Sequence, residues 1–137
     1  MVACPCEVCA STDVRDHRLR SSALVSDGET NVVIDAGPDF RYQMLRAGVR
    51  TLDAILLTHE HKDHTGGIDD VRAFNYFQQR PTDIYATERT LDAVRRDFHY
   101  AFGENRYPGV PDIELHTIAD EPIRLGSLTF EPIYGLH

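Results

Sequence analysis

The feature that most constrains this chain is the run HEHKDH at residues 59–64, which places four potential metal ligands within six positions. It follows residues 51–58, which are apolar on both faces toward their end and are therefore predicted to form a central strand covered on both sides. Gly66 and Gly67 come next, and they let the backbone pass close to bound ions. A ligand-rich loop between a buried strand and a helix indicates a metal centre rather than a solvated polar loop.

The spacing of these ligands indicates two ions. His59 and His61 are two residues apart, so in an extended segment they project from the same side and can share one ion. Asp63 and His64 come after the chain begins to turn, and they can reach a second ion. Imidazole and carboxylate ligands together suit zinc, and also manganese or iron. The helix that follows directs its positive end toward the site, which favours an anionic ligand there.

Patterns typical of strands and helices alternate along the chain and predict an α/β layered fold. Residues 3–20 are polar and are expected to form an ordered loop. A hairpin is predicted from two β-like segments, and three helices from apolar spacing and caps. The expected strands are 22–25, 30–35, 51–58, 83–86, 114–118, 123–125 and 128–133, and the expected helices are 39–47, 68–79 and 88–98.

Composition restricts the partners. The formal net charge of −8 argues against a nucleic-acid backbone as a partner, but it leaves a small phosphorylated substrate open because bound cations reverse the local field. No apolar run is long enough to cross a bilayer, and the first nine residues do not form a signal peptide. We therefore expect a cytoplasmic protein without membrane contact, with a homodimer as an open possibility.

The three cysteines of the chain lie together at Cys4, Cys6 and Cys9. Three thiols cannot pair off completely, and their spacing leaves little room for an unstrained disulfide. In a cytoplasmic protein such a cluster is more readily interpreted as a metal site, although tetrahedral zinc needs a fourth ligand. Reduced cysteines without metal are the alternative.

Residues 58–67 (THEHKDHTGG) resemble the HxHxDH signature of the metallo-β-lactamase superfamily, and residues 33–37 (VIDAG) resemble the strand that precedes it. The resemblance implies an αββα sandwich, of which this chain would be the N-terminal half to two-thirds. Residues 1–137 would then be a single partial domain that is cut at both ends. The resemblance also implies a metal-dependent hydrolase in which two divalent ions, zinc or manganese, activate water against a phosphoryl or acyl centre.

The resemblance also assigns roles to individual residues. The two pairs of ligands named above would each bind one of the two ions, and Asp63 would also hold the attacking water or take its proton. Asp35 would orient the metal ligands from behind them. His137, after the last predicted strand, stands where the family has a further histidine ligand.

Within the superfamily, the cysteine loop at residues 1–20 resembles that of phosphoribosyl 1,2-cyclic phosphate phosphodiesterases, as do residues 69–77 and 107–111. This implies a structural zinc at the three cysteines and a small cyclic phosphate ester as substrate. The alternatives are another hydrolase on the same fold, namely an RNA-processing nuclease or a thioesterase, and a non-catalytic, metal-stabilised binding protein resembling pyrroloquinoline-quinone biosynthesis protein B. The intact histidine run counts against the binding protein.

Isolated polar residues are less informative. Three arginines can be considered as phosphate contacts, but the sequence does not choose among Arg72, Arg80 and Arg106. Three histidines outside the run are interpreted as surface or packing residues, namely His17, His99 and His116.

Overall fold

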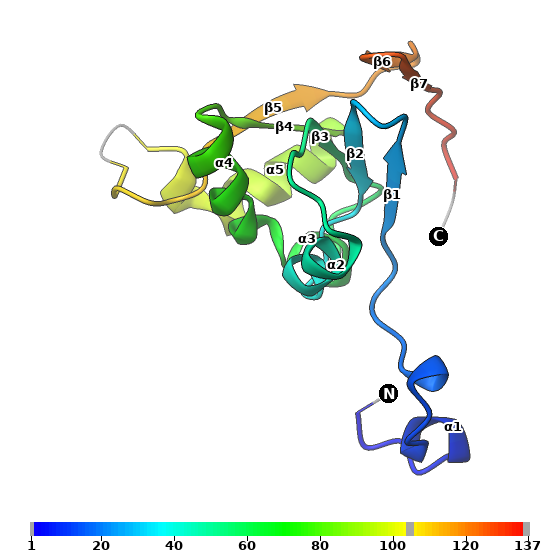
Figure 1. The fold of residues 1–137 in the computed structure, drawn as a ribbon. Helices are drawn as coiled ribbons and strands as arrows, with labels where there is room; N and C mark the ends of the chain where they lie inside the picture. The colour runs from blue at the N-terminus through cyan, green and yellow to red at the C-terminus, as the bar shows by residue number, and fades with distance from the viewer. Residues whose placement is uncertain (1, 104–105, 136–137) are drawn as a thin grey trace.

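A five-stranded mixed sheet of order β1-β2-β3-β4-β5 forms the centre of the computed structural model, which describes residues 2–103 and 106–135 (Figure 1). Its strands are β1 (Ala23–Ser26), β2 (Asn31–Ile34), β3 (Ala54–Leu56), β4 (Thr82–Ala86) and β5 (Ile113–Thr117). β1 is antiparallel to β2, whereas β2 to β5 are mutually parallel. The carboxyl ends of the four parallel strands therefore share one edge of the sheet, where open α/β folds bind their ligands.

Helices and a hairpin occupy opposite faces of this sheet. The α-helices are α1 (Glu7–Ala10), α2 (Phe40–Ala47), α3 (Lys62–Thr65), α4 (Arg72–Gln78) and α5 (Glu88–Asp97), and the 3₁₀ turns are η1 (Val14–Asp16), η2 (Ile68–Val71) and η3 (His99–Ala101). The hairpin consists of β6 (Ile123–Leu125) and β7 (Leu128–Phe130). α1 and η1 lie apart from the sheet, at the end of an extended segment that leads into β1 (Figure 1).

Alternation along the strands creates two apolar layers. Val33, Ile55 and Ile84 face the helices and pack into a core with residues such as Phe40 and Leu91, all of them fully buried. The opposite face carries a smaller cluster that includes β6 and β7. Each fully buried aliphatic side chain contributes about 1.5–3 kcal/mol relative to an exposed one. The described part of the chain is thus a helix layer, a sheet and a hairpin on the other face, in agreement with the predicted α/β class.

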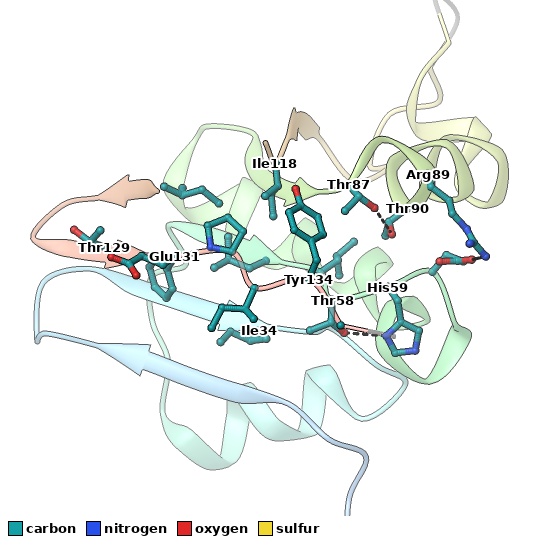
Figure 2. A pocket seen from close by; sticks show the side chains of 18 residues that line it. Ile34, Thr58, His59, Thr87, Arg89, Thr90, Ile118, Thr129, Glu131 and Tyr134 are labelled. Carbon is teal, nitrogen blue, oxygen red and sulfur yellow. Dashed lines mark hydrogen bonds and ion pairs between the residues drawn. The ribbon is translucent and has the colours of Figure 1, made fainter. Parts of the chain in front are cut away.

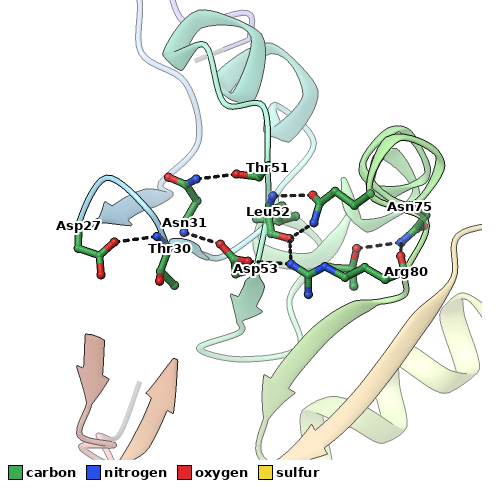
Figure 3. A network of polar contacts seen from close by, with 10 residues as sticks. Asp27, Thr30, Asn31, Thr51, Leu52, Asp53, Asn75 and Arg80 are labelled. Atoms are coloured by element: carbon green, nitrogen blue, oxygen red, sulfur yellow. Dashed lines mark hydrogen bonds and ion pairs between the residues drawn. The ribbon is translucent and has the colours of Figure 1, made fainter. Parts of the chain in front are cut away.

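The amino-terminal edge of the parallel strands is fixed by a polar network (Figure 3). The Asp53 carboxylate accepts hydrogen bonds from the Asn31 backbone N–H and from the Arg80 guanidinium, both at 2.7 Å. The Gln78 side chain accepts from the Leu52 N–H at 2.7 Å and donates to the Leu52 carbonyl at 3.1 Å. These contacts join β2, β3 and the end of α4. The histidine run lies at the opposite edge, where the parallel strands have their carboxyl ends.

Most predicted elements are present, and the differences have local causes. The helix predicted at 39–47 is α2, which ends at Gly48 with φ 68° as a left-handed C-cap. The single helix predicted at 68–79 is wrong, because η2 precedes α4 and its i→i+3 bonds wind that stretch more tightly. The loop predicted at 3–20 contains α1 and η1, since Cys6 and Asp13 cap these turns with their side chains. No helix among the described residues is both long enough and apolar enough to span a membrane.

Candidate metal centre

The histidine run begins just beyond the end of β3, at the carboxyl edge of the sheet. All three residues of β3 are buried, as the pattern at 51–58 predicted. The Leu57 N–H donates to the Tyr85 carbonyl at 2.8 Å, which extends the β3–β4 pairing by one residue before the chain turns away. His61 then serves as the N-cap residue of α3. The His61 carbonyl accepts from the N–H groups of His64 and Thr65 at 2.9 and 3.1 Å, so the ligand-rich segment folds into a tight turn.

This turn gathers the predicted ligands on one side. The ring centroids of His59 and His61 are 4.7 Å apart, and those of His59 and His64 are 4.0 Å apart. The Asp63 carboxylate lies 3.6 Å from His64 Nε2. His61 and Asp63 are exposed and the other two histidines are half-buried, so ions can enter from solvent. A set of three imidazoles and one carboxylate fits zinc or manganese.

Asp35, which follows β2, lies directly beneath this cluster. Its side chain is 5% exposed and its backbone has φ 63°, in the left-handed region that L-residues other than Asn and Asp rarely adopt. Its carboxylate accepts a hydrogen bond from His64 Nδ1 at 2.7 Å and from the Thr58 N–H at 2.8 Å. The residue predicted to orient the ligands is therefore in contact with one of them, His64.

Two glycines permit the close approach of the turn that carries the histidine run (residues 59–65) to the loop after β2. A Cβ atom on Gly37 would lie 2.1 Å from the Asp63 carbonyl oxygen, and one on Gly67 would lie 2.1 Å from the Gly37 carbonyl oxygen. The Ala36 N–H donates to the His64 carbonyl at 2.8 Å across the same contact. Side chains at these positions would separate the two segments. Gly67 therefore allows close backbone approach to the loop after β2, whereas the predicted approach of Gly66 and Gly67 to bound ions stays a prediction.

Ion pairs tie the turn to α5. Glu60 pairs with Arg89 at 2.5 Å, and Lys62 pairs with Asp97 at 2.5 Å while lying 5.7 Å from the centre of the Phe98 ring. The Lys62 ammonium lowers the pKa of the Asp97 carboxyl. The residues between the ligands thus hold the turn against the helix layer.

A cavity of about 670 Å³ opens beside His59 (Figure 2). Thr58, Thr87, Arg89 and Tyr134 line it together with apolar side chains from β2, β3 and the segment after β7. Sequence reasoning missed Arg89, because an arginine at the start of an amphipathic helix gives no sign of what it faces.

The three arginines considered as phosphate contacts form ion pairs elsewhere, namely Arg72 with Asp69, Arg80 with Asp53 and Arg106 with Asp112. His137 lies outside the described residues.

The cysteines form a second cluster, far from the histidine run. The sulfur atoms of Cys4, Cys6 and Cys9 all lie within 4.8 Å of one another, on α1 and the residues before it. Hydrogen bonds from the Cys9 N–H and from the neighbouring thiols lower the pKa of the Cys6 thiol to about 7. Because the thiolate is the form that binds metal, this geometry fits the predicted zinc site.

Another ligand group was not anticipated. Asp83, Glu114 and His116 on β4 and β5 also bring their ligand atoms within 4.8 Å of one another. His116 hydrogen-bonds to Asp83 at 2.7 Å and stacks on Tyr85 at 4.6 Å between ring centroids, which agrees with its interpretation as a packing residue.

Among the described side chains, only this group and the three cysteines bring three ligand atoms within 4.8 Å of one another. The histidine run is predicted to supply two ligands to each of two ions. In that arrangement each ion would need further ligands from other parts of the protein.

Comparison with known proteins identifies the family. Residues 30–137 match the family described as "Beta-lactamase superfamily domain". The chain is 44% identical over 138 residues to an octanoyltransferase of Porphyromonas gingivalis. The alignment covers 99% of this chain and 28% of that protein.

Two solved structures are similar to this chain. One is a diphosphatase of the PhnP family, with a TM-score of 0.84 and 37% identity over 96% of this chain and 50% of that chain. The other is zinc-bound PqqB from Methylobacterium extorquens, with a TM-score of 0.65 and 27% identity over 89% of this chain and 42% of that one. The chain thus spans half or less of the length of these proteins. It belongs to the β-lactamase superfamily domain family and has the metallo-β-lactamase fold, which the histidine run predicted.

Proposed function

We propose that this chain forms part of a two-metal hydrolase that cleaves a phosphate ester, and that its substrate is a small cyclic phosphodiester. The observation that carries the proposal is the gathering of His59, His61, His64 and Asp63 at the carboxyl edge of the sheet, with a buried carboxylate beneath them. The similarity to a PhnP-family diphosphatase supports phosphoryl chemistry.

The chain's own residues have distinct tasks in this reaction. Bound ions would lower the pKa of a coordinated water and neutralise the charge that develops on the phosphoryl group. The Asp63 side chain is 48% exposed and lies 3.6 Å from His64 Nε2. Its carboxylate is therefore accessible from solvent, and in this proposal it would accept the proton of the attacking water.

The cavity beside His59 is suited to a small substrate. Its volume of about 670 Å³ lies in the range of small-molecule pockets. Arg89 provides a guanidinium at its rim and is 83% exposed, although it pairs with Glu60. This cation can attract the phosphate of an incoming substrate. The apolar wall formed by residues such as Ile34 and Ile118 would hold the rest of the molecule.

The cysteine cluster has a separate task. We propose that Cys4, Cys6 and Cys9 bind one structural zinc ion with a fourth ligand from outside the cluster. Such an ion would order a segment that has no buried residues in its helical turns α1 and η1.

Hydrolysis of defined esters tests the proposal. The chain is incubated with zinc or manganese and with bis(p-nitrophenyl) phosphate, a 2′,3′-cyclic nucleotide, a nucleoside diphosphate or an octanoyl thioester. We expect turnover of a phosphodiester that is lost in His59→Ala/His61→Ala. Turnover of the thioester alone would replace the proposal with a thioesterase.

The similarity to zinc-bound PqqB supports a second candidate, a non-catalytic binding protein stabilised by metal. The two candidates differ in one measurable respect. A binding protein would hold metal at the histidine run and yet turn over none of these substrates, and that result would favour it.

A further inference from the structure

A single buried carboxylate connects two of the predicted metal ligands, one directly and one through a hydroxyl group. Asp35 accepts a hydrogen bond from His64 Nδ1 at 2.7 Å. It also accepts from the Thr58 hydroxyl, whose oxygen lies 2.8 and 3.0 Å from the two carboxylate oxygens. The same hydroxyl oxygen lies 3.0 Å from His59 Nδ1. Thr58 therefore stands between Asp35 and His59.

The positions of the protons follow from the chemistry of these groups. An ionised carboxylate only accepts hydrogen bonds, so the Thr58 hydroxyl donates its one proton to Asp35. Toward His59 the hydroxyl can then only accept, and the proton in that contact must belong to His59 Nδ1. A neutral imidazole protonated on Nδ1 has its lone pair on Nε2.

His64 contacts the same carboxylate directly, without an intermediary. Its Nδ1 donates to Asp35, so its lone pair is also on Nε2. That nitrogen lies 3.6 Å from the Asp63 carboxylate, on the side of the ligand cluster. One carboxylate thus fixes both histidines in the same tautomer, with the metal-binding nitrogen away from Asp35.

We propose that Thr58 is a positioning residue, which holds the His59 ring in orientation and in the Nδ1–H tautomer and thereby strengthens metal binding at His59. The inference rests on the metal site of the proposed function. Outer partners of ligating histidines affect metal affinity by about 10- to 100-fold. Thr58 is solvent-exposed, so water can replace part of its contact, and we expect the lower end of this range.

The tautomer can be measured without metal. Histidine ¹⁵N shifts are recorded by NMR on the metal-free chain at about pH 8.5, above the ordinary pKa range of histidine. We expect wild-type His59 to be protonated on Nδ1, and Thr58→Val to give a mixture of tautomers while His64 is unchanged. Thr58→Ser, which keeps the hydroxyl, should retain the wild-type pattern. Thr51→Val is a matched control, because Thr51 is also exposed but bonds to Asn31 at the opposite edge of the sheet.

Metal affinity provides the second readout. Zinc titration should show about tenfold weaker binding in Thr58→Val, with affinity restored in Thr58→Ser and unchanged in Thr51→Val. Protonation of wild-type His59 on Nε2 would overturn the inference even if no variant folds. So would a Thr58→Val chain with the wild-type tautomer and affinity. Failure of hydrolysis would instead refute the proposed function, because the tautomer does not depend on turnover.

Discussion

Replacing Gly37 with alanine should weaken metal binding at the candidate centre and lower the stability of the chain. The new Cβ would lie 2.1 Å from the Asp63 carbonyl oxygen, about 0.9 Å short of the 3.0 Å that such contacts need. Because the obstructing atom belongs to the backbone, the turn that carries Asp63 and His64 and the loop that carries Gly37 have to separate by a similar distance. Ligand constellations tolerate displacements of about 0.5 Å. Overpacking of this kind costs about 1–3 kcal/mol in the free energy of unfolding.

Urea denaturation followed by circular dichroism measures the change in stability, and zinc titration measures the change in affinity. We expect Gly37→Ala to unfold at lower urea with an unchanged slope, and to bind zinc more weakly than wild type. Gly135→Ala is the control, because nothing lies within 4 Å of its added Cβ. A Gly37→Ala chain with the wild-type midpoint and zinc affinity would refute the account of this close approach.

Two further predictions concern the core and the turns. Leu91→Ala empties a fully buried site and should lower the free energy of unfolding by about 2–5 kcal/mol. The control Leu45→Ala, at a 64% exposed position, should change it by less than about 0.5 kcal/mol. Equal effects of the two variants in urea denaturation would contradict the assignment of Leu91 to the core. The Ser127 hydroxyl, with the Thr30 and Glu29 N–H groups, lowers the pKa of Asp27 from 3.8 to about 2. This pKa shift contributes stability above pH 3.8 that is lost as pH falls through about 2. Ser127→Ala should raise the Asp27 pKa in a ¹³C NMR titration and weaken this acid dependence, and an unchanged titration would count against the contact.

The elements that local patterns specify could be predicted from the sequence. The buried β3 and the helix α2 with its Gly48 cap follow from apolar spacing and capping residues within a few positions. The ligand run was found because its residues are contiguous. The change from the 3₁₀ turn η2 to the α-helix α4 was not predicted, because the spacing of apolar residues is similar in the two segments.

The contacts that complete the site come from distant parts of the chain. Thr58 and Asp35 are 23 residues apart, and their hydrogen bonds depend on the pairing of β2 with β3. Arg89 reaches the candidate site because α5 lies beside the turn that carries the histidine run, where Arg89 pairs with Glu60. Asp83 and His116 meet through the pairing of β4 with β5. A single sequence does not specify such pairings, so the contacts of Arg89, Asp83 and His116 were not predicted, and Asp35 was identified only through the resemblance to the superfamily.

The most direct test of the metal centre is the metal content of the purified chain. The chain is purified without chelators in a Cys4→Ser/Cys6→Ser/Cys9→Ser background, which removes the three thiols of the cysteine cluster. Metal per chain is then measured by elemental mass spectrometry. We expect zinc or manganese to be bound to this chain, and to be lost when His59→Ala/His61→Ala is added. Equal metal with and without the two histidines, or none in either, would contradict the assignment of residues 59–64 as a metal-binding site.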